Sequence, residues 1–187
     1  MTTDARPLRA DAQRNRDRLL TAAATAFARD SGASLDSIAR DAGVGIGTLY
    51  RHFPTREALV EATYRNELNR LCDAADELLT DQPPDVALRA WMDRLIDYMA
   101  AKHGMADALR ALIAAGGNPF AASRSRLTAA LTTLLDAGVE QGLLRGDVAA
   151  DDILVGLSGL AMHAAPDRRD QLGRLLDLLM DGLRRHP

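Results

Sequence analysis

The sequence is poor in several residue types, and each scarcity excludes a class of protein. Its single cysteine, Cys72, cannot form an internal disulfide, which excludes a disulfide-stapled secreted domain and favours a reducing, cytoplasmic location. No apolar run approaches the roughly 20 residues that a membrane-spanning helix needs, and no signal peptide pattern opens the sequence. We therefore expect neither a membrane protein nor an exported one.

Aromatic residues make up only 4% of the 187 residues, and runs of β-branched residues are almost absent. Alanine and leucine are abundant instead, and apolar positions recur at helical spacing in segment after segment. The pattern predicts an all-α protein of about nine helices. The length suits either one large domain or a small domain followed by a medium one.

Lysine is nearly absent too, so the positive charge comes almost entirely from arginine. A net charge of −3 would argue against nucleic-acid binding, but the charge is unevenly distributed. Residues 1–56 hold nine arginines against six aspartates, and residues 57–187 hold 14 basic against 20 acidic side chains. A basic N-terminal part on an acidic remainder is expected when only one end of a protein meets phosphates.

Residues 33–56 carry the pattern on which the functional prediction depends. The segment predicts a helix over residues 34–42 that Ser34 caps, a tight turn at Gly43, and a shorter helix over residues 46–53 that ends before Pro54. Each helix has an apolar stripe: Leu35, Ile38, Ala39 and Ala42 on the first, and Ile46, Leu49, Tyr50 and Phe53 on the second. This is the helix-turn-helix pattern, whose second helix is shaped to enter the major groove of DNA.

The literal residues are more specific than the pattern. Residues 43–59, GVGIGTLYRHFPTREAL, resemble the recognition helix and the following helix start of the TetR family of one-component transcriptional regulators. Residues 16–32, RDRLLTAAATAFARDSG, look like the first helix of that family, and the resemblance covers residues 14–68. It implies a three-helix DNA-binding head, placed at residues 14–56, and a C-terminal helical body at residues 57–187 for effector binding and dimerisation.

The helix-turn-helix supplies the candidates for DNA contact. Thr48 is the best placed for base edges, through its hydroxyl or through its methyl group against thymine. Tyr50, His52 and Arg56 are expected at phosphates, a role that the resemblance also implies, and Ser34 would add a contact from the other side. Packing within the head is the alternative for Tyr50. The full set is Ser34, Gly45, Ile46, Gly47, Thr48, Tyr50, Arg51, His52 and Arg56.

Two positions depart from the family pattern. Many TetR relatives have serine and lysine where this sequence has Gly45 and Ile46, so a polar cap and a cationic contact are missing. We expect base readout to depend on apolar contact, on close backbone approach at Gly47, and on DNA shape. Leu49 and Phe53 are assigned to the core of the head.

Helix boundaries outside this motif follow from periodicity and from breakers. Residues 1–13 lack an apolar pattern and predict a flexible basic arm, whose Arg6, Arg9 and Arg14 could reach phosphates or a minor groove; a solvated tail is the alternative. Further helices are expected over residues 14–31, 56–79, 85–104, 105–116, 118–141, 151–165 and 167–183, the 118–141 helix opened by Asn118-Pro119 and the last capped by Asp167. The helix over 56–79 would be about 36 Å long, enough to connect head and body.

The body offers an apolar lining for an effector. The resemblance, more than the spacing, implies that a small apolar or amphipathic effector binds among the fourth to seventh helices. The candidate lining residues are Trp91, Leu95, Tyr98, Met99, His103, Leu109, Phe120, Leu127, Leu131 and Met162. Ordinary core packing is an equal alternative for each of them.

The last two helices are candidates for a dimer interface, because two apolar helices at the end of the chain exceed what one small body needs to bury. The candidate residues are Ile153, Gly156, Leu157, Leu160, Leu172, Leu175, Leu176 and Leu179. Internal core is the alternative for either helix taken singly. A two-fold dimer would present two recognition helices about one DNA turn apart and predicts a pseudo-palindromic site.

No pattern of an enzyme is present. The sequence lacks a glycine-rich phosphate loop, zinc-ligand spacing and a nucleophile elbow, so we expect no cofactor and no metal, and a capping or core role for His103 and His163. The predicted function is a sequence-specific, homodimeric transcriptional repressor that a ligand releases from its operator. The alternatives are an effector-independent or architectural DNA-binding protein, and a helical enzyme or scaffold that merely contains the motif.

Overall fold

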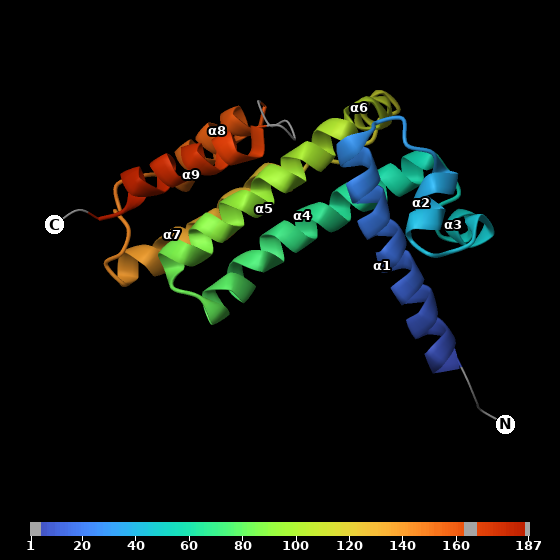
Figure 1. Ribbon diagram of the computed structural model, residues 1–187, viewed down its shortest axis with the longest axis horizontal. Helices are drawn as coiled ribbons and strands as arrows, with labels where there is room; N and C mark the ends of the chain where they lie inside the picture. Colours follow the sequence, from blue (N-terminus) through green and yellow to red (C-terminus); the bar gives the residue numbers. More distant parts are fainter. Residues whose placement is uncertain (1–4, 163–167, 186–187) are drawn as a thin grey trace. The chain divides into compact units, whose positions relative to one another are not determined.

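The structure, a computed structural model, describes residues 5–162 and 168–185, and is helical through most of them. Figure 1 shows the helices in chain order: α1 (Ala5–Arg29), α2 (Leu35–Asp41), α3 (Ile46–His52), α4 (Arg56–Asp81), α5 (Pro84–Gly104), α6 (Ala106–Ala114), α7 (Ser123–Glu140), α8 (Ala150–Ala161) and α9 (Arg169–Leu183). The β pairing in these residues is one isolated antiparallel bridge between Leu144 and Arg184. The all-α prediction is confirmed.

Two helix starts differ from the predicted ones by more than two residues. α1 begins at Ala5 rather than at residue 14, so residues 5–13 extend the first helix instead of forming an arm without regular structure. Alanine, arginine, leucine and glutamine are strong helix formers, and Pro7 is tolerated because the first turn of a helix has no N–H partners to lose. α7 begins at Ser123 rather than at Asn118-Pro119. Pro119 is buried, and turns lead from it to α7. The predicted cap Asp167 and His163 lie outside the described residues.

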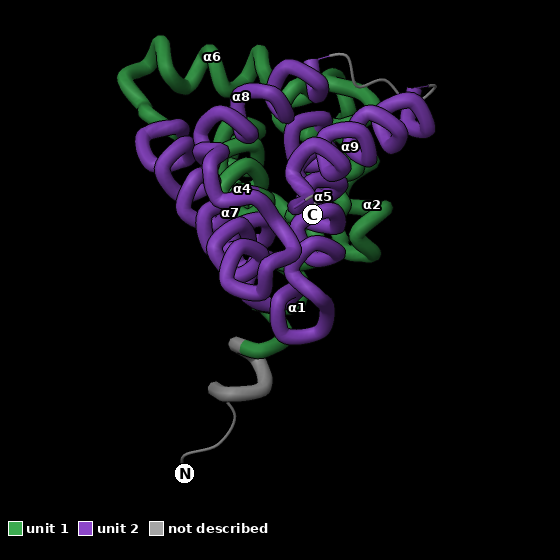
Figure 2. Tube along the Cα trace, turned by 90° about the vertical axis from the view of Figure 1, so that its left-hand side faces the viewer, with its two compact units in different colours: residues 1–67, 101–119 green, residues 68–100, 120–187 purple. Residues whose placement is uncertain are grey.

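The chain forms two compact units, coloured separately in Figure 2. Unit 1 comprises residues 1–67 and 101–119, and unit 2 comprises residues 68–100 and 120–187. α4 and α5 therefore contribute residues to both units, and α6 belongs with the N-terminal helices. No helix among the described residues is both long and apolar enough to cross a bilayer.

The core of unit 1 forms where α1, α2 and α3 pack on one another. α1 buries one stripe that includes Leu19, Leu20 and Phe27, and the helix-turn-helix buries the facing Ile38, Leu49 and Phe53. Leu59 and Tyr64 of α4 are buried in the same unit. At the other side of α1, a Cβ atom placed on Gly104 at the end of α5 would lie 1.7 Å from the carbonyl oxygen of Phe27. The two backbones touch there, and only glycine fits.

Unit 2 is held by apolar packing and by a line of ion pairs. Trp91 is fully buried and donates its indole N–H to the carbonyl of Leu71 over 2.8 Å. α5 and α9 are tied by Arg89, whose Nε lies 2.7 Å from Asp177, and by Arg169 at 2.5 Å from Asp97. Arg89 and Asp97 are eight residues, or about two helical turns, apart and therefore lie on the same face of α5. α9 covers that face.

Candidate DNA-binding surface

The helix-turn-helix is closed by local hydrogen bonds that the sequence pattern predicts. The Ser34 hydroxyl accepts from the amide of Ser37 over 3.1 Å, which caps α2. Gly43 has φ +66°, a left-handed conformation that side chains resist, and its amide donates to Arg40 over 3.0 Å. Thr55 then caps α4 by accepting from the Ala58 amide over 3.1 Å. These bonds hold α2 and α3 at a fixed turn.

α3 has one face inside the unit and one face outside. Leu49 and Phe53 are buried, as predicted, and anchor the helix on the core. Tyr50 is 49% exposed, so the alternative of a packing aromatic does not describe it. Arg51 is also exposed, and Thr48 is half-buried. The outer face of this short helix is therefore free to meet another molecule.

The first residues of that face carry no bulky side chain. Gly45 and Gly47 are exposed, and a Cβ atom placed on either would meet nothing within 4 Å. Neither glycine is therefore needed to fit α3 onto the protein. Ile46 and His52 are half-buried at the margins of the face, the His52 ring 6.1 Å from that of Phe53.

Arg51 is held against α3 by two hydrogen bonds. Its Nε donates to the carbonyl of Gly47 over 3.2 Å, and its Nη2 donates to the hydroxyl of Thr48 over 3.0 Å. The side chain therefore runs back toward the start of the helix, where recognition helices contact bases.

Arg56 has a different environment from the one that the sequence predicts. Its Nη1 donates to the carbonyl of Ala33 over 2.5 Å and its Nη2 to the carbonyl of Ser31 over 2.6 Å. Its guanidinium also lies over the Phe27 ring, 5.0 Å from the ring centre. A half-buried arginine bonded in this way braces the loop between α1 and α2; its phosphate contact stays a prediction.

Two exposed arginines near the turn escaped the sequence analysis. Arg40 lies in the last turn of α2 and is exposed. Arg18 on α1 lies so close to the turn that a Cβ atom on Gly43 would be 3.7 Å from its Nη1. The uneven charge distribution indicated that such residues exist, but only the fold brings Arg18 beside a turn 25 residues later. Arg16, by contrast, lies 5.3 Å over the Phe53 ring and packs.

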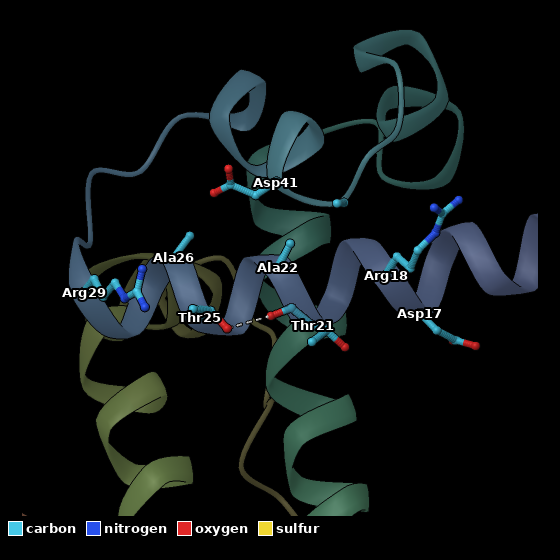
Figure 3. Close-up of a pocket in the computed structure, with 9 residues that line it drawn as sticks. Asp17, Arg18, Thr21, Ala22, Thr25, Ala26, Arg29 and Asp41 are labelled. Atoms are coloured by element: carbon cyan, nitrogen blue, oxygen red, sulfur yellow. Dashed lines mark hydrogen bonds between the residues drawn. The ribbon is translucent and has the colours of Figure 1, made fainter.

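A groove of about 650 Å³ runs along α1 on the same unit. Figure 3 shows Arg18 and Arg29 well apart on α1, the small side chains of Ala22 and Ala26 between them, and Asp41 across on α2. The groove is open and carries both signs of charge. It therefore lacks the apolar, enclosed character of a typical small-molecule pocket.

The predicted effector-lining residues differ widely in exposure. Six are buried: Trp91, Leu95, Tyr98, Leu109, Leu127 and Leu131. Met99 and Phe120 are half-buried, whereas His103 is exposed and Met162 is 74% exposed. Leu109 and His103 belong to unit 1 and the other eight to unit 2. An exposed side chain does not line an enclosed cavity, so His103 and Met162 are the weakest members of the set.

One buried polar atom has no explanation in the packing. The Thr63 hydroxyl of α4 is fully buried and has no hydrogen-bond partner among the described residues. A helical threonine usually donates to the carbonyl four residues earlier, and this one does not. Its desolvation is uncompensated in unit 1.

The predicted dimer residues divide between the inside and the outside of unit 2. Ile153, Leu157, Leu172 and Leu176 are buried within the subunit, Leu160, Leu175 and Leu179 are half-buried, and Gly156 is exposed. The exposed apolar side chains of these two helices are others: Val155 (56%), Leu178 (66%) and Met162. α8 and α9 each bury one side in their own core and present another side outward.

The ionisable groups of the described residues give no catalytic or metal-binding cluster. No group of three His, Cys, Asp or Glu side chains that could hold a metal ion occurs in the described part of the chain. Burial raises the pKa of the half-buried Cys72 thiol, so it is a poor nucleophile at neutral pH.

Comparisons with known proteins agree with this geometry. Residues 19–63 match the family of bacterial regulatory proteins of the tetR type, and residues 83–185 match the C-terminal domain of SbtR-like transcriptional regulators. No curated protein sequence matches the chain significantly.

Solved structures are similar over more than nine-tenths of the chain. A TetR transcriptional regulator from Streptomyces coelicolor is 53% identical, with a TM-score of 0.88 over 92% of this chain and 99% of that one. A TetR regulatory protein from Mycobacterium vanbaalenii is 37% identical, with a TM-score of 0.76 over 96% of this chain and 100% of that one. A third structure, 26% identical with a TM-score of 0.67 over 91% of this chain and 97% of that one, concerns the control of antibiotic production by a bacterial hormone.

Proposed function

Because the chain belongs to the TetR family of DNA-binding transcriptional regulators, we propose that it is a cytoplasmic, ligand-responsive repressor that binds a pseudo-palindromic operator as a homodimer. It is a regulator and not an enzyme. The observation that carries the proposal is the outer face of α3, where Tyr50 and Arg51 are exposed on a helix that Leu49 anchors to the core.

DNA contact is proposed to divide between bases and phosphates. Gly45, Ile46, Gly47, Thr48 and Arg51 lie on the part of α3 that would enter the major groove, and Tyr50, His52 and Ser34 would meet the sugar–phosphate backbone. Arg18 and Arg40 join the phosphate contacts, because both are exposed beside the turn. The net charge of +3 over residues 1–56 supports the phosphate contacts.

Dimerisation is proposed to use the outward side of α8 and α9. Val155, Gly159 and Met162 recur at helical spacing on α8, and Leu175, Leu178 and Gly182 do so on α9. Exposed apolar side chains beside exposed glycines let the helices of a second copy approach closely. The half-buried Leu160 and Leu179 and the exposed Gly156 would border the contact.

The effector response is proposed to act through α4. This helix contributes residues both to the unit that holds α3 and to unit 2, so a ligand that prefers one position of α4 changes the spacing of the two heads. A coupling free energy of roughly 1–3 kcal/mol is typical of such switches. The similar structure that concerns control by a bacterial hormone supports a response to a signal molecule.

The proposal is tested by selecting bound duplexes from random DNA with the full-length protein. We expect a palindrome with half-sites about one helical turn apart, bound by two subunits, with an affinity that falls steeply as salt rises. Titrating candidate effectors against that operator separates ligand-responsive repression from effector-independent binding. An absence of salt-dependent DNA binding would reject the proposal.

A further inference from the structure

The base-reading surface of α3 contains one side chain that is already positioned for a specific base. Arg51 would be free to move on an exposed helix, but two hydrogen bonds fix it, from Nε to the Gly47 carbonyl and from Nη2 to the Thr48 hydroxyl. Fixing an arginine in advance reduces the conformational entropy that binding would otherwise cost. The guanidinium lies beside the residues that the helix-turn-helix geometry brings to base edges.

The hydrogen bonds leave the recognition edge of the guanidinium intact. A guanidinium has five N–H donors, and the two bonds use the Nε–H and one Nη2–H. Both Nη1–H groups and the second Nη2–H remain, so the Nη1–Nη2 edge can still donate two parallel bonds. That fork matches the O6 and N7 acceptors of guanine in the major groove, which is the commonest specific arginine contact.

The neighbouring residues clear the approach to this edge. Gly45 and Gly47 place no side chain between the helix backbone and the groove. Thr48 accepts from Arg51, so its own hydroxyl proton points elsewhere, and its role is to orient the guanidinium. A carboxylate nearby could bind the guanidinium in place of guanine, but the first turn of α3 contains no acidic residue.

From this geometry we infer that Arg51 reads a guanine in each half-site of the operator, and that Thr48 and Gly47 are positioning residues for it. The inference rests on the proposed function, because it needs α3 in a major groove. It adds a base identity and the residue that reads it.

The experiment compares base discrimination between variants. We expect selection with the wild-type protein to return a conserved G·C pair in each half-site. Replacing that pair by A·T should weaken wild-type binding about 5- to 150-fold per site, which corresponds to roughly 1–3 kcal/mol. Arg51→Ala should bind the two duplexes alike, because it has no donor for guanine. Arg51→Lys should keep only part of the discrimination, because its ammonium can donate to guanine but lacks the planar two-donor fork. Arg51→Lys should keep the wild-type salt dependence.

Three further variants test the positioning role and the charge. Thr48→Val keeps the side-chain shape without the acceptor and should lose part of the guanine preference, whereas Thr48→Ser should restore it. Arg94→Ala removes the same charge from an exposed position on α5 and should leave the preference unchanged.

Three results would overturn the inference. One is a selected palindrome without guanine. Another is Arg51→Ala with its discrimination intact and with uniformly weaker binding and a smaller salt slope, which marks a phosphate contact. The third is equal discrimination by Thr48→Val and wild type. Selection of no sequence at all would instead reject the proposed function itself.

Discussion

Arg56 allows the sharpest test of how this head works, because its expected and observed roles predict opposite results. The sequence places it at a DNA phosphate, whereas in the structure it braces the α1–α2 loop through the carbonyls of Ser31 and Ala33 and packs over Phe27. A hydrogen bond from a charged donor is worth about 1.5–3 kcal/mol, and a cation–π contact adds about 0.5–2 kcal/mol. Water can replace the guanidinium at the exposed Ser31, so the lower part of these ranges applies there.

We therefore expect Arg56→Ala to lower the free energy of unfolding by about 2–4 kcal/mol. For a chain of this size that is a fall in Tm of roughly 4–16 °C, measured by circular dichroism on the full-length protein. The slope of log affinity against log salt should stay at the wild-type value, because no phosphate contact is lost. A lost phosphate contact in each subunit would instead reduce that slope by about 1.8 for the dimer.

Arg40→Ala is the matched control in the same unit. Arg40 is exposed, and the described residues show no hydrogen bond or ion pair of its side chain, so this variant should leave Tm unchanged and reduce the salt slope. Suppose Arg56→Ala gave the pattern expected of Arg40→Ala, with Tm within about 1 °C of wild type and a slope smaller by about 1.8. The brace would then be unimportant for stability, and the phosphate role predicted from the sequence would be correct.

Four other substitutions have expected outcomes that follow from single contacts. Gly47→Ala should raise Tm, because alanine in a helix is about 1 kcal/mol more stable than glycine. The same substitution should weaken operator binding, because it places a methyl group toward the groove. Equal or tighter binding would contradict a close approach of the backbone to DNA. Thr63→Val should raise the free energy of unfolding by about 1 kcal/mol in denaturant titration by removing an unpaired buried hydroxyl; a loss would mean that the hydroxyl has a partner. Gly104→Ala should destabilise the protein by about 1–3 kcal/mol or more, because the new Cβ meets the Phe27 carbonyl and the two backbones must separate. An unchanged Tm would show that the two backbones can separate at little cost. Leu178→Arg should leave the subunit folded, since this side chain is 66% exposed, and produce monomers in sedimentation; a persistent dimer would place the interface elsewhere.

The order and identity of the helices could be predicted because they depend on local signals. Ser34 and Thr55 cap α2 and α4 by accepting from the amide three residues later in the chain. Gly43 turns the chain in a left-handed conformation that favours glycine. Helical periodicity likewise assigned Leu49 and Phe53 to the core. Each of these features is decided by neighbours within about one helical turn, and such neighbours can be read from the sequence.

The role of Arg56 could not be predicted, because its partners are main-chain carbonyls 23 and 25 residues earlier in the chain. Every residue has a main-chain carbonyl, so the sequence does not indicate which carbonyls are available to accept a hydrogen bond from a side chain. The resemblance to a family supplied a role for the position, and that role fits any basic residue there. The position of Gly104 against Phe27 is hidden for the same reason, since the contact joins two backbones.

The helices proposed for dimerisation show that apolar periodicity alone favours the side of a helix that a subunit buries for itself. The leucine stripe is the most apolar side of α9, and its members Leu172 and Leu176 are in the core of the subunit. A second copy can use only the side that remains, where Val155 on α8 and Leu178 on α9 are exposed among glycines and polar residues. A homodimer interface on a small body is therefore expected one helical face away from the strongest stripe, where moderately apolar residues lie beside glycines.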